Sequence, residues 1–441
     1  MPVIEFAAQS SRDPDSQYAS TARLLNCYRE PVADGRFIVK SVPGMNPVAD
    51  TGLPYCRAMA TVEGVLYLVQ GGVLHRIGKN GTAVALAEVP DSPETTISSN
   101  NGLITVVADG RYFTWDGETL AEPAPGAFDA FGSVTFIGQL TVLTEKGGRR
   151  VQWSGVADAS TLGGLDFATT ESRDDDILRA LPIGGGIWFF KTGSIEQWYQ
   201  TGEGLAVVPG STRDVGLKAF GLLSPIRDGA FFVGADNVVY LVRDGAMQAI
   251  STPPVSTSIA TQAPDRTFYY EDEAHKFCVV TFTDRPAWVF DVATLEWHER
   301  AEGEALGPWF AEAAAEAYGK HHVGTARGGV FTLERINRDG DDPLIRQCVS
   351  RTLDGGGTWL RVPMLKIAAR VGWHGEPARM TLETSRDHGH TWGLYRERDL
   401  GEIGQFGRET IFRNLGAYRQ VTLRVTVADP VEVSFAAEAL L

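Results

Sequence analysis

A two-strand unit recurs along most of this chain and restricts its possible folds more than any other feature of the sequence. Each copy consists of an apolar run, a turn that usually contains glycine, a second apolar run and a polar turn. Copies start about 30 to 52 residues apart, and the later intervals settle near 45. The copies occupy residues 64–77, 102–115, 133–153, 185–199, 229–242, 275–290 and 321–333. Because a unit of this size cannot bury both faces of its strands alone, the series predicts an all-β chain with an irregular β-propeller of six or seven blades.

The composition fits many short strands joined by tight turns. The 441 residues include 49 glycines and 22 prolines, and 10% of them are aromatic. A hydrophobic share of 43% with 22% charged residues indicates a folded protein rather than a disordered one. The formal net charge of −15 argues against a surface that holds nucleic acid, because such surfaces neutralise phosphates with lysine and arginine.

The cysteines and the first residues bear on where the protein is made. The four cysteines (Cys27, Cys56, Cys278 and Cys348) are scattered, which favours reduced and mostly buried thiols. The sequence MPVIEFAAQSSRD lacks the basic start and apolar run of a signal peptide. No apolar run approaches the ~20 residues that a membrane helix needs. We therefore expect no membrane anchor and assembly in a cytoplasm.

The character of the chain changes twice, which divides it into three parts. Residues 1–60 are punctuated by proline and predict an irregular N-terminal arm. Residues 61–341 hold the recurring unit and predict the propeller-like domain. Residues 342–441 contain longer alternating strands, which predict a β-sandwich-like domain. Within the second part, residues 309–320 predict a helix, because alanine and glutamate dominate them and Gly319 can end it.

Two short motifs in the last part resemble the Asp boxes of sialidases. They read TLDGGGTW at 352–359 and SRDHGHTW at 385–392. In each, an aspartate can accept backbone N–H groups, a glycine permits the turn, and a tryptophan can hold the turn against the sheet. These residues are Asp354, Gly356 and Trp359 in the first box, and Asp387, Gly389 and Trp392 in the second. In sialidases such boxes are structural, so the two copies predict locked hairpin turns rather than a hydrolytic site.

No other motif gives a strong catalytic or metal-binding signal. Asp174, Asp175 and Asp176 fit a solvated loop better than a cation site. His321 and His322 are adjacent on an expected strand and would point to opposite faces. Residues 337–343 lack the spacing of a calcium loop. We therefore expect no enzyme activity, no cofactor and no metal.

Several stretches, taken in order, carry a resemblance that spans nearly the whole chain. They are LLNCYRE (24–30), KSVPGM (40–45), VQWSGVADASTL (151–162), DDDIL (174–178), IWFFKTGSIEQWYQTGEG (187–204), GADNVVYLVRDGAMQAISTPPVSTSI (234–259) and the closing residues 399–441. Together they resemble the tail nozzle or hub proteins of short-tailed bacteriophages, also called packaged-DNA stabilisation proteins. The segment IEQWYQTG and the closing residues are the most specific parts of this resemblance.

The resemblance implies a structural protein of the virion tail. Its members form a homo-hexameric tube below the portal and the head-to-tail adaptor protein, and contact tail fibres or tailspikes and a tail needle or plug. Such a tube retains packaged DNA and conducts it during ejection without sequence-specific binding, and the family has no known catalytic chemistry. An acidic channel wall would keep DNA from sticking. The alternative is a tail-associated glycan-binding or sialidase-like propeller protein.

Overall fold

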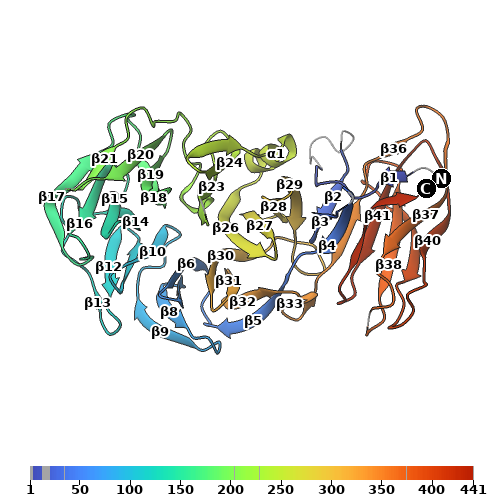
Figure 1. Cartoon of the computed structure of the whole chain (residues 1–441), viewed down its shortest axis with the longest axis horizontal. Helices are drawn as coiled ribbons and strands as arrows, with labels where there is room; N and C mark the ends of the chain where they lie inside the picture. Colours follow the sequence, from blue (N-terminus) through green and yellow to red (C-terminus); the bar gives the residue numbers. More distant parts are fainter. Residues whose placement is uncertain are drawn as a thin grey trace.

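The structure is a computed structural model that describes residues 3–11, 20–33, 35–202, 204–227, 229–373 and 375–440. It consists mainly of strands in two parts, a ring of blades and a β-sandwich beside it (Figure 1). The ring is the propeller expected from the recurring unit, and its blades follow one another in chain order. In the described residues, no helix is long and apolar enough to cross a membrane.

Six of the blades are continuous four-strand segments of the chain. Blade one is β6 (Cys56–Val62), β7 (Val65–Gln70), β8 (Val73–Ile77) and β9 (Ala83–Glu88). Blade two is β10 (Thr95–Asn100), β11 (Leu103–Ala108), β12 (Arg111–Trp115) and β13 (Leu120–Ala121). Blade three is β14 (Phe131–Ile137), β15 (Leu140–Glu145), β16 (Arg150–Ser154) and β17 (Leu162–Thr169). Blade four is β18 (Ile177–Ile183), β19 (Gly186–Lys191), β20 (Ile195–Gln200) and β21 (Leu205–Val207). Blade five is β22 (Leu223–Ile226), β23 (Gly229–Val233), β24 (Val239–Arg243) and β25 (Ala246–Ala249). Blade six is β26 (Pro264–Asp272), β27 (His275–Phe282), β28 (Ala287–Asp291) and β29 (Glu296–Arg300).

The seventh blade closes the ring with strands from both ends of the propeller segment. It contains β30 (Ala311–Ala317), β31 (Lys320–Thr325), β32 (Gly329–Glu334) and β5 (Gly44–Asp50). Strand β5 pairs with β32 in the antiparallel sense, with Met45 opposite Leu333. The ring therefore has seven blades, and each recurring unit of the sequence provides a central hairpin of one blade. This closure joins strands almost 300 residues apart and removes the free edges that the ring would otherwise expose.

The helix expected at residues 309–320 is wrong, because this segment forms β30, the innermost strand of blade seven. Ala313, Ala314 and Ala315 line the centre of the ring, on the innermost strand of the blade. Hydrogen bonding to β31 and this position override the helix propensity of alanine. The α-helix lies instead at α1 (Pro253–Thr261), where two prolines begin it. A short 3₁₀ turn, η1 (Phe220–Leu222), precedes blade five.

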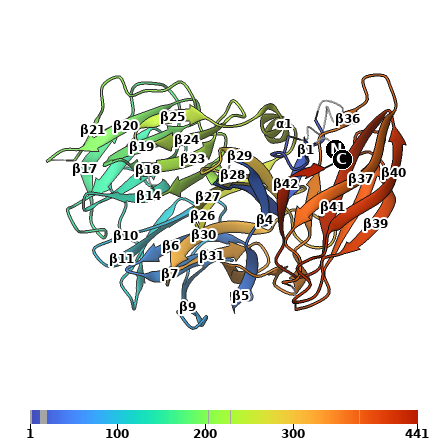
Figure 2. The same ribbon diagram turned by 45° about the vertical axis from the view of Figure 1, so that its right-hand side comes forward.

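The second part of the structure is a sandwich of two sheets (Figure 2). One sheet runs in the order β3 (Cys27–Pro31), β4 (Phe37–Ser41), β42 (Ser434–Leu440), β37 (Leu360–Ala369) and β40 (Thr410–Tyr418), with β1 (Val3–Glu5) also on β42. The other contains β35 (Arg346–Val349), β41 (Gln420–Val427), β38 (Arg379–Ser385) and β39 (Gly393–Asp399), with β36 (Leu353–Asp354) on β41. Alternate apolar residues of both sheets meet in one buried core that includes Leu365, Phe412, Leu423 and Phe435.

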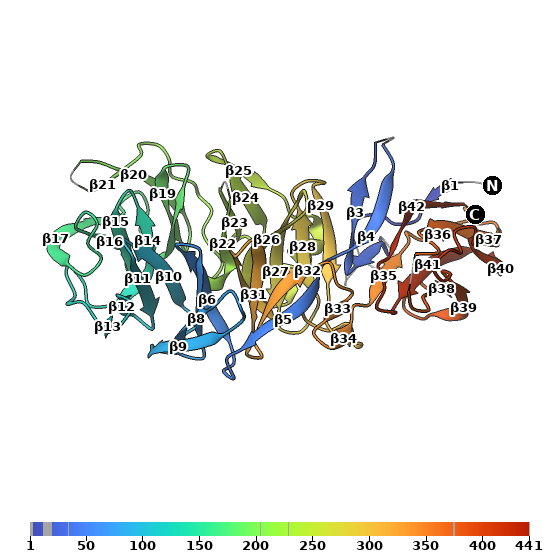
Figure 3. The same ribbon diagram turned by 60° about the horizontal axis from the view of Figure 1, so that its bottom comes forward.

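The irregular arm expected at residues 1–60 is also wrong, because much of this segment is strand, and part of it ties the two parts together. Residues 12–19 of the segment lie outside the described residues. Strand β2 (Arg23–Leu25) pairs in parallel with β29 of blade six and antiparallel with β35 of the sandwich. The β3–β4 hairpin stands between the propeller and the sandwich (Figure 3). One hydrogen-bonded sheet thus runs from blade six through β2 into the sandwich.

Charged groups reinforce this joint. Glu299 on β29 is paired with Arg23 on β2, and Arg285 Nη2 lies 2.9 Å from a Glu299 oxygen. All three side chains are at most 13% exposed, so removing one partner would leave a buried charge uncompensated. A small hairpin of β33 (Arg338–Asp339) and β34 (Asp342–Pro343) lies beside β5 and leads into the sandwich.

Candidate interaction surfaces

The second Asp box forms the locked turn that its sequence predicts. Asp387 accepts hydrogen bonds from Ser385 Oγ at 2.6 Å and from the Thr391 backbone N–H at 2.8 Å. These bonds, with that from the Thr391 hydroxyl, hold the pKa of Asp387 well below its usual range. Gly389 has φ +86°, and its N–H donates to Ser385 Oγ. Trp392 is half-buried under the guanidinium of Arg424, whose carbon lies 4.1 Å from the ring centroid.

The first Asp box has only part of this arrangement. Asp354 accepts the Gly356 N–H at 2.8 Å, and Gly356 takes φ +61°. Trp359, however, is 66% exposed and does not hold the turn against the sheet, contrary to its expected role. Both turns belong to the sandwich, away from the propeller centre, so they are features of local structure rather than parts of a pocket.

The other sequence candidates prove to be structural contacts. Asp175 pairs with the fully buried Lys191 at 2.6 Å, which gives one member of the acidic run a role inside the protein. His322 is buried while its neighbour His321 accepts the Glu271 N–H, consistent with opposite faces of β31. Asp339 lies in the buried joint between the two parts. Among the described residues, no three histidine, cysteine or acidic side chains gather as metal ligands would.

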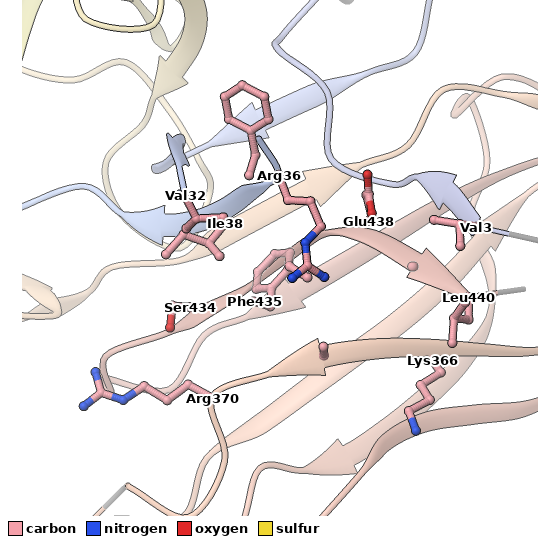
Figure 4. Close-up of a pocket in the computed structure, with 14 residues that line it drawn as sticks. Val3, Val32, Arg36, Ile38, Lys366, Arg370, Ser434, Phe435, Glu438 and Leu440 are labelled. Carbon is pink, nitrogen blue, oxygen red and sulfur yellow. The ribbon is translucent and has the colours of Figure 1, made fainter. Parts of the chain in front are cut away.

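A hollow of about 510 Å³ lies on the sandwich sheet that contains β4, β42 and β37 (Figure 4). The surface is hollowed here because the side chains that line it are short: Ser434 and Ala436 on β42 and Ala368 on β37. Arg36 extends into the hollow toward Phe435, and Lys366 and Arg370 lie on its rim. The hollow is therefore largely apolar inside, with charged residues of both signs at its edge, including Glu438.

An exposed aromatic cluster adjoins this hollow through Arg370. Trp373 and Phe406 are 60% and 56% exposed, and their ring centroids lie 5.2 Å apart. Arg370 stacks on the Trp373 ring at 4.9 Å, and Ile403 beside the pair is 71% exposed. We call Trp373, Ile403 and Phe406 the aromatic cluster. Large apolar side chains gathered on a surface are characteristic of protein-binding sites, and tryptophan often dominates their affinity.

Backbone contacts hold the two loops of the aromatic cluster in place. The Gly372 N–H donates to Leu400 O at 3.1 Å, and the Gly404 N–H donates to Gly372 O at 3.0 Å. A side chain at residue 372 would meet the backbone of Gln405 at 2.7 Å, so only glycine permits this approach. The aromatic cluster is thus preorganised, which reduces the entropy lost on binding.

The centre of the propeller encloses a cavity of about 500 Å³. Residues from the innermost strands of all seven blades line it. At the amino ends of the inner strands the Arg266 side chain leaves blade six, and its Nη1 donates to Pro93 O just before blade two at 3.0 Å. The centre is therefore a small chamber rather than a wide pore.

Charged residues line this chamber in two layers. The amino-end layer consists of Arg57, Arg179, Arg266 and Glu312, near the starts of β6, β18, β26 and β30. The carboxyl-end layer consists of Arg227, Glu271 and Glu316. In the carboxyl-end layer, Arg227 pairs with Glu271 at 3.0 Å and with Glu316 at 3.6 Å.

The charges of the amino-end layer are not paired with one another as those of the carboxyl-end layer are. Arg57 pairs with Asp91 at 2.7 Å. Within the described residues, Arg179, Arg266 and Glu312 have no ion-pair partner within 4.0 Å. Burial lowers the pKa of Arg179 to about 10, with a further contribution from Arg266, and burial raises the pKa of Glu312 to about 7.

Arginines and a Tyr–Glu pair in one propeller chamber are residue types that a sialidase also uses. Here Tyr269 donates to Glu271, which is itself paired with Arg227. Burial, followed by this hydrogen bond and the charge of Glu271, raises the pKa of Tyr269 far above its usual value. The resting chain therefore holds Tyr269 in its protonated form.

Sequence reasoning missed both the aromatic cluster and the charged chamber. The residues of the amino-end layer share a position rather than a motif, since each lies near the start of the inner strand of its blade. The signal that could have found them is a charged residue at the start of the first apolar run in several units. No comparable sequence signal marks Trp373 and Phe406, because the sequence does not show whether a given tryptophan is buried or exposed.

Comparison with solved structures gives other propellers at low identity. The WD40 propeller domain of Doa1 is 11% identical over 66% of this chain and 96% of that chain, with a TM-score of 0.44. The RRP9 WD40 repeats are 11% identical over 67% of this chain and 99% of that chain, with a TM-score of 0.45. The extracellular domain of BT4673 from B. thetaiotaomicron is 9% identical over 84% of this chain and 58% of that chain, with a TM-score of 0.46. No curated protein matches the sequence.

Family comparison is more informative because it covers both parts of the chain. The family described as "Bacteriophage P22 Gp10, beta-propeller" matches residues 18–334. The family described as "Bacteriophage P22 Gp10, beta-sandwich" matches residues 345–440. The propeller and sandwich seen in the structure thus occur in the same order as in one known phage protein. The chain belongs to the bacteriophage P22 Gp10 family of phage tail proteins that stabilise packaged DNA, as the resemblance of its sequence predicted.

Proposed function

We propose that this protein is a subunit of the tail nozzle or hub, a homo-hexameric tube below the portal and head-to-tail adaptor. The tube retains packaged DNA and conducts it during ejection. The observation that carries this arrangement is the narrow centre of the propeller, a chamber of about 500 Å³ with Arg266 reaching across its amino end. A DNA duplex is too wide to pass through such a chamber, because its major groove alone is about 12 Å wide. A passage for DNA therefore has to form between copies.

The construction of the subunit suits a wall element. One sheet continues from blade six through β2 into the sandwich, and buried ion pairs flank the joint. Hinge motion between the propeller and the sandwich would have to break both this sheet and these ion pairs. We infer that the propeller and the sandwich move as one block and that the tube resists the pressure of the packaged genome through rigid subunits.

The charge of the chain fits transport rather than tight binding of DNA. The sequence carries 55 acidic and 40 basic residues. An acidic wall repels phosphate and so lowers the affinity of DNA for the tube, which passage requires. In our proposal DNA contacts the tube without sequence-specific recognition.

We assign the contact between neighbouring copies to the aromatic cluster. Its rings are exposed in the single chain and lie on loops that backbone hydrogen bonds hold in place. The adaptor above, tail fibres or tailspikes at the side and a needle or plug below are the further partners that we propose. Assembly takes place in the cytoplasm of the host bacterium.

A glycan-binding or sialidase-like role is not favoured. Both Asp boxes lie in the sandwich, and Tyr269 in the propeller chamber is held protonated. The family match also concerns a structural phage protein.

The test is electron microscopy and light scattering of the purified protein, alone and with the portal–adaptor complex. We expect a six-membered ring or tube on the adaptor. A protein that stays monomeric and ignores the adaptor would contradict the nozzle proposal.

A double substitution, Trp373→Ser with Phe406→Ser, tests the contact between copies. We expect single subunits on the adaptor and no closed ring, with normal thermal unfolding. The matched control is Leu165→Ser, which changes a 91% exposed side chain on blade three. Complete loss of adaptor binding would show that the aromatic cluster contacts the adaptor instead.

A further inference from the structure

The amino-end layer of the propeller chamber has the composition of an anion-binding site. We propose that it binds a small oxyanion, a carboxylate or a phosphate, between Arg179 and Arg266. Neither the family match nor the nozzle proposal assigns a ligand to this chamber, and the inference does not depend on them.

Arg266 is buried and Arg179 is partly buried, and neither has an ion-pair partner within 4.0 Å among the described residues. Arg179 Nη1 donates to the carbonyl oxygens of Leu223 at 2.7 Å and Phe220 at 3.3 Å. Its Nε is shielded from solvent and has no hydrogen-bond partner in the described part of the chain. Arg266 is 7% exposed and uses Nη1 for Pro93 O. Both guanidiniums lie at η1, since Arg179 donates to Phe220 O and Arg266 Nη1 lies 3.4 Å from where a Cβ on the next residue, Gly221, would lie. Carbonyl oxygens satisfy single N–H groups, but they do not cancel two positive charges.

The geometry of a guanidinium explains which ligand would complete the site. Its planar set of N–H groups matches the paired oxygens of a carboxylate or phosphate, and such charge-assisted bonds are about twice as strong as neutral ones. The N–H groups of the two guanidiniums that are not used for carbonyl oxygens supply these donors. An oxyanion between them would relieve the repulsion of the two cations.

Glu312 adds a carboxyl group whose protonation state can change when an anion binds. It is 8% exposed, and its Oε2 has no hydrogen-bond partner among the described residues. Because burial raises its pKa to about 7, a substantial fraction is protonated at neutral pH. The protonated carboxyl can donate to a bound oxyanion, whereas the ionised form repels it.

The rest of the chamber limits the size of the ligand. Short apolar side chains form much of the wall, including Ala58, Ala60, Ala313 and Ala314. The volume of about 500 Å³ admits a small molecule but not a folded partner. An apolar wall also strengthens the attraction between the arginines and an anion by lowering the local dielectric.

The alternative is that both arginines act only as braces between blades, since each donates to carbonyl oxygens of another blade or connecting segment. A brace needs no ligand. Binding measurements on the whole chain separate the two roles, with inorganic phosphate and malonate as the probes and chloride at matched ionic strength as the reference.

We expect calorimetry to show one site per chain for at least one probe, and the tighter probe identifies the class of oxyanion. Arg179→Met and Arg266→Met should each weaken binding about tenfold or more, the worth of one charge-assisted hydrogen bond. Arg111→Met is the control, because this arginine lies on the outer part of blade two and pairs with Glu122.

Glu312→Gln supplies a readout that a brace would not change. The substitution removes the negative charge, so binding should tighten severalfold at pH 8 and change little at pH 5.5. Absence of binding by both probes in the wild-type chain would overturn the proposal. Equal affinities in the wild type and both arginine variants would also overturn it.

Discussion

Arg300 and Asp339 form a buried ion pair at the point where the propeller meets the sandwich. Arg300 Nη2 donates to Asp339 Oδ1 at 2.7 Å, and the two side chains are 1% and 3% exposed. Arg300 ends the outer strand of blade six, while Asp339 belongs to the hairpin that leads into the sandwich. Arg300 also donates to Asn26 Oδ1 at 3.1 Å, so three distant segments meet at one guanidinium.

We predict that Asp339→Ala lowers the free energy of unfolding by about 3–5 kcal/mol, because it leaves the Arg300 charge buried without its partner. Urea unfolding followed by tryptophan fluorescence measures this loss. Glu122→Gln is the control, since the Arg111–Glu122 pair is exposed and its loss should hardly move the midpoint. Equal effects of the two substitutions would show that the buried pair is not a structural link.

The two Asp boxes should differ in their contribution to stability. Asp387→Ala removes the acceptor for Ser385 and Thr391, whereas Asp354→Ala removes one bond to the Gly356 N–H. We expect a clear decrease in Tm for the first variant and a smaller one for the second, as measured by differential scanning calorimetry. Equal decreases would contradict the conclusion that only the Asp387 turn is locked.

Much of the propeller could be predicted from sequence because its signal is local. Each blade has its central hairpin where an apolar run, a turn and a second apolar run follow one another. Long-range pairing has no such signal. Nothing in residues 23–25 indicates a partner such as Glu299, which is opposite Leu25 in the parallel ladder. Residues 1–60 are therefore read from sequence as an irregular arm.

The burial of individual side chains is the second feature that could not be predicted from the sequence. Alanine-rich β30 reads as a helix because its environment, the propeller centre, is invisible in the sequence. Trp359 and Trp392 occupy the same motif position, yet one is 66% exposed and the other lies under Arg424. The arginines of the chamber come from different blades, and only the closed ring brings them together.

All four cysteines should be unreactive in the folded protein. They are buried, and burial raises the pKa of the Cys56 and Cys278 thiols far above their usual value, so little thiolate forms. We expect no rapid reaction with a thiol reagent at pH 8 under native conditions and four thiols after denaturation in guanidinium. A thiol that reacts quickly in the native state would show that one of these cores opens readily.

Acid should destabilise the protein through His298. Burial is the largest cause that lowers the pKa of this histidine to about 4, and the positive charges of Arg300 and His275 act in the same direction against the attraction of Asp291. The unfolded chain takes up this proton near pH 6.5 and the native chain does not. Stability is therefore lost as pH falls from about 6.5 toward 4, by roughly 2–3 kcal/mol.

His298→Phe tests this contribution, because it keeps an aromatic ring beside Phe277 and removes the titrating group. We expect the variant to lose less stability than the wild type between pH 6.5 and 4. The exposed His390→Gln serves as the control and should follow the wild-type profile. An unchanged acid profile in His298→Phe would assign the acid sensitivity to other groups.

Glu312 should act in the opposite direction, destabilising the protein as pH rises. Burial keeps its pKa at about 7 in the folded chain against about 4.5 for an ordinary glutamate, even though Arg266 and Arg57 favour the charged form. Between these values the native state holds a proton that the unfolded state has released, so the free energy of unfolding falls with increasing pH. Glu312→Gln removes this loss, and the variant should exceed the wild type by about 2–3 kcal/mol at pH 9 while matching it near pH 5. Urea unfolding at pH 5, 7 and 9 measures the difference, with Glu316→Gln at the other end of the chamber as the control. A pH-independent difference between Glu312→Gln and the wild type would mean that packing of the side chain, and not its charge, sets the stability of the propeller centre.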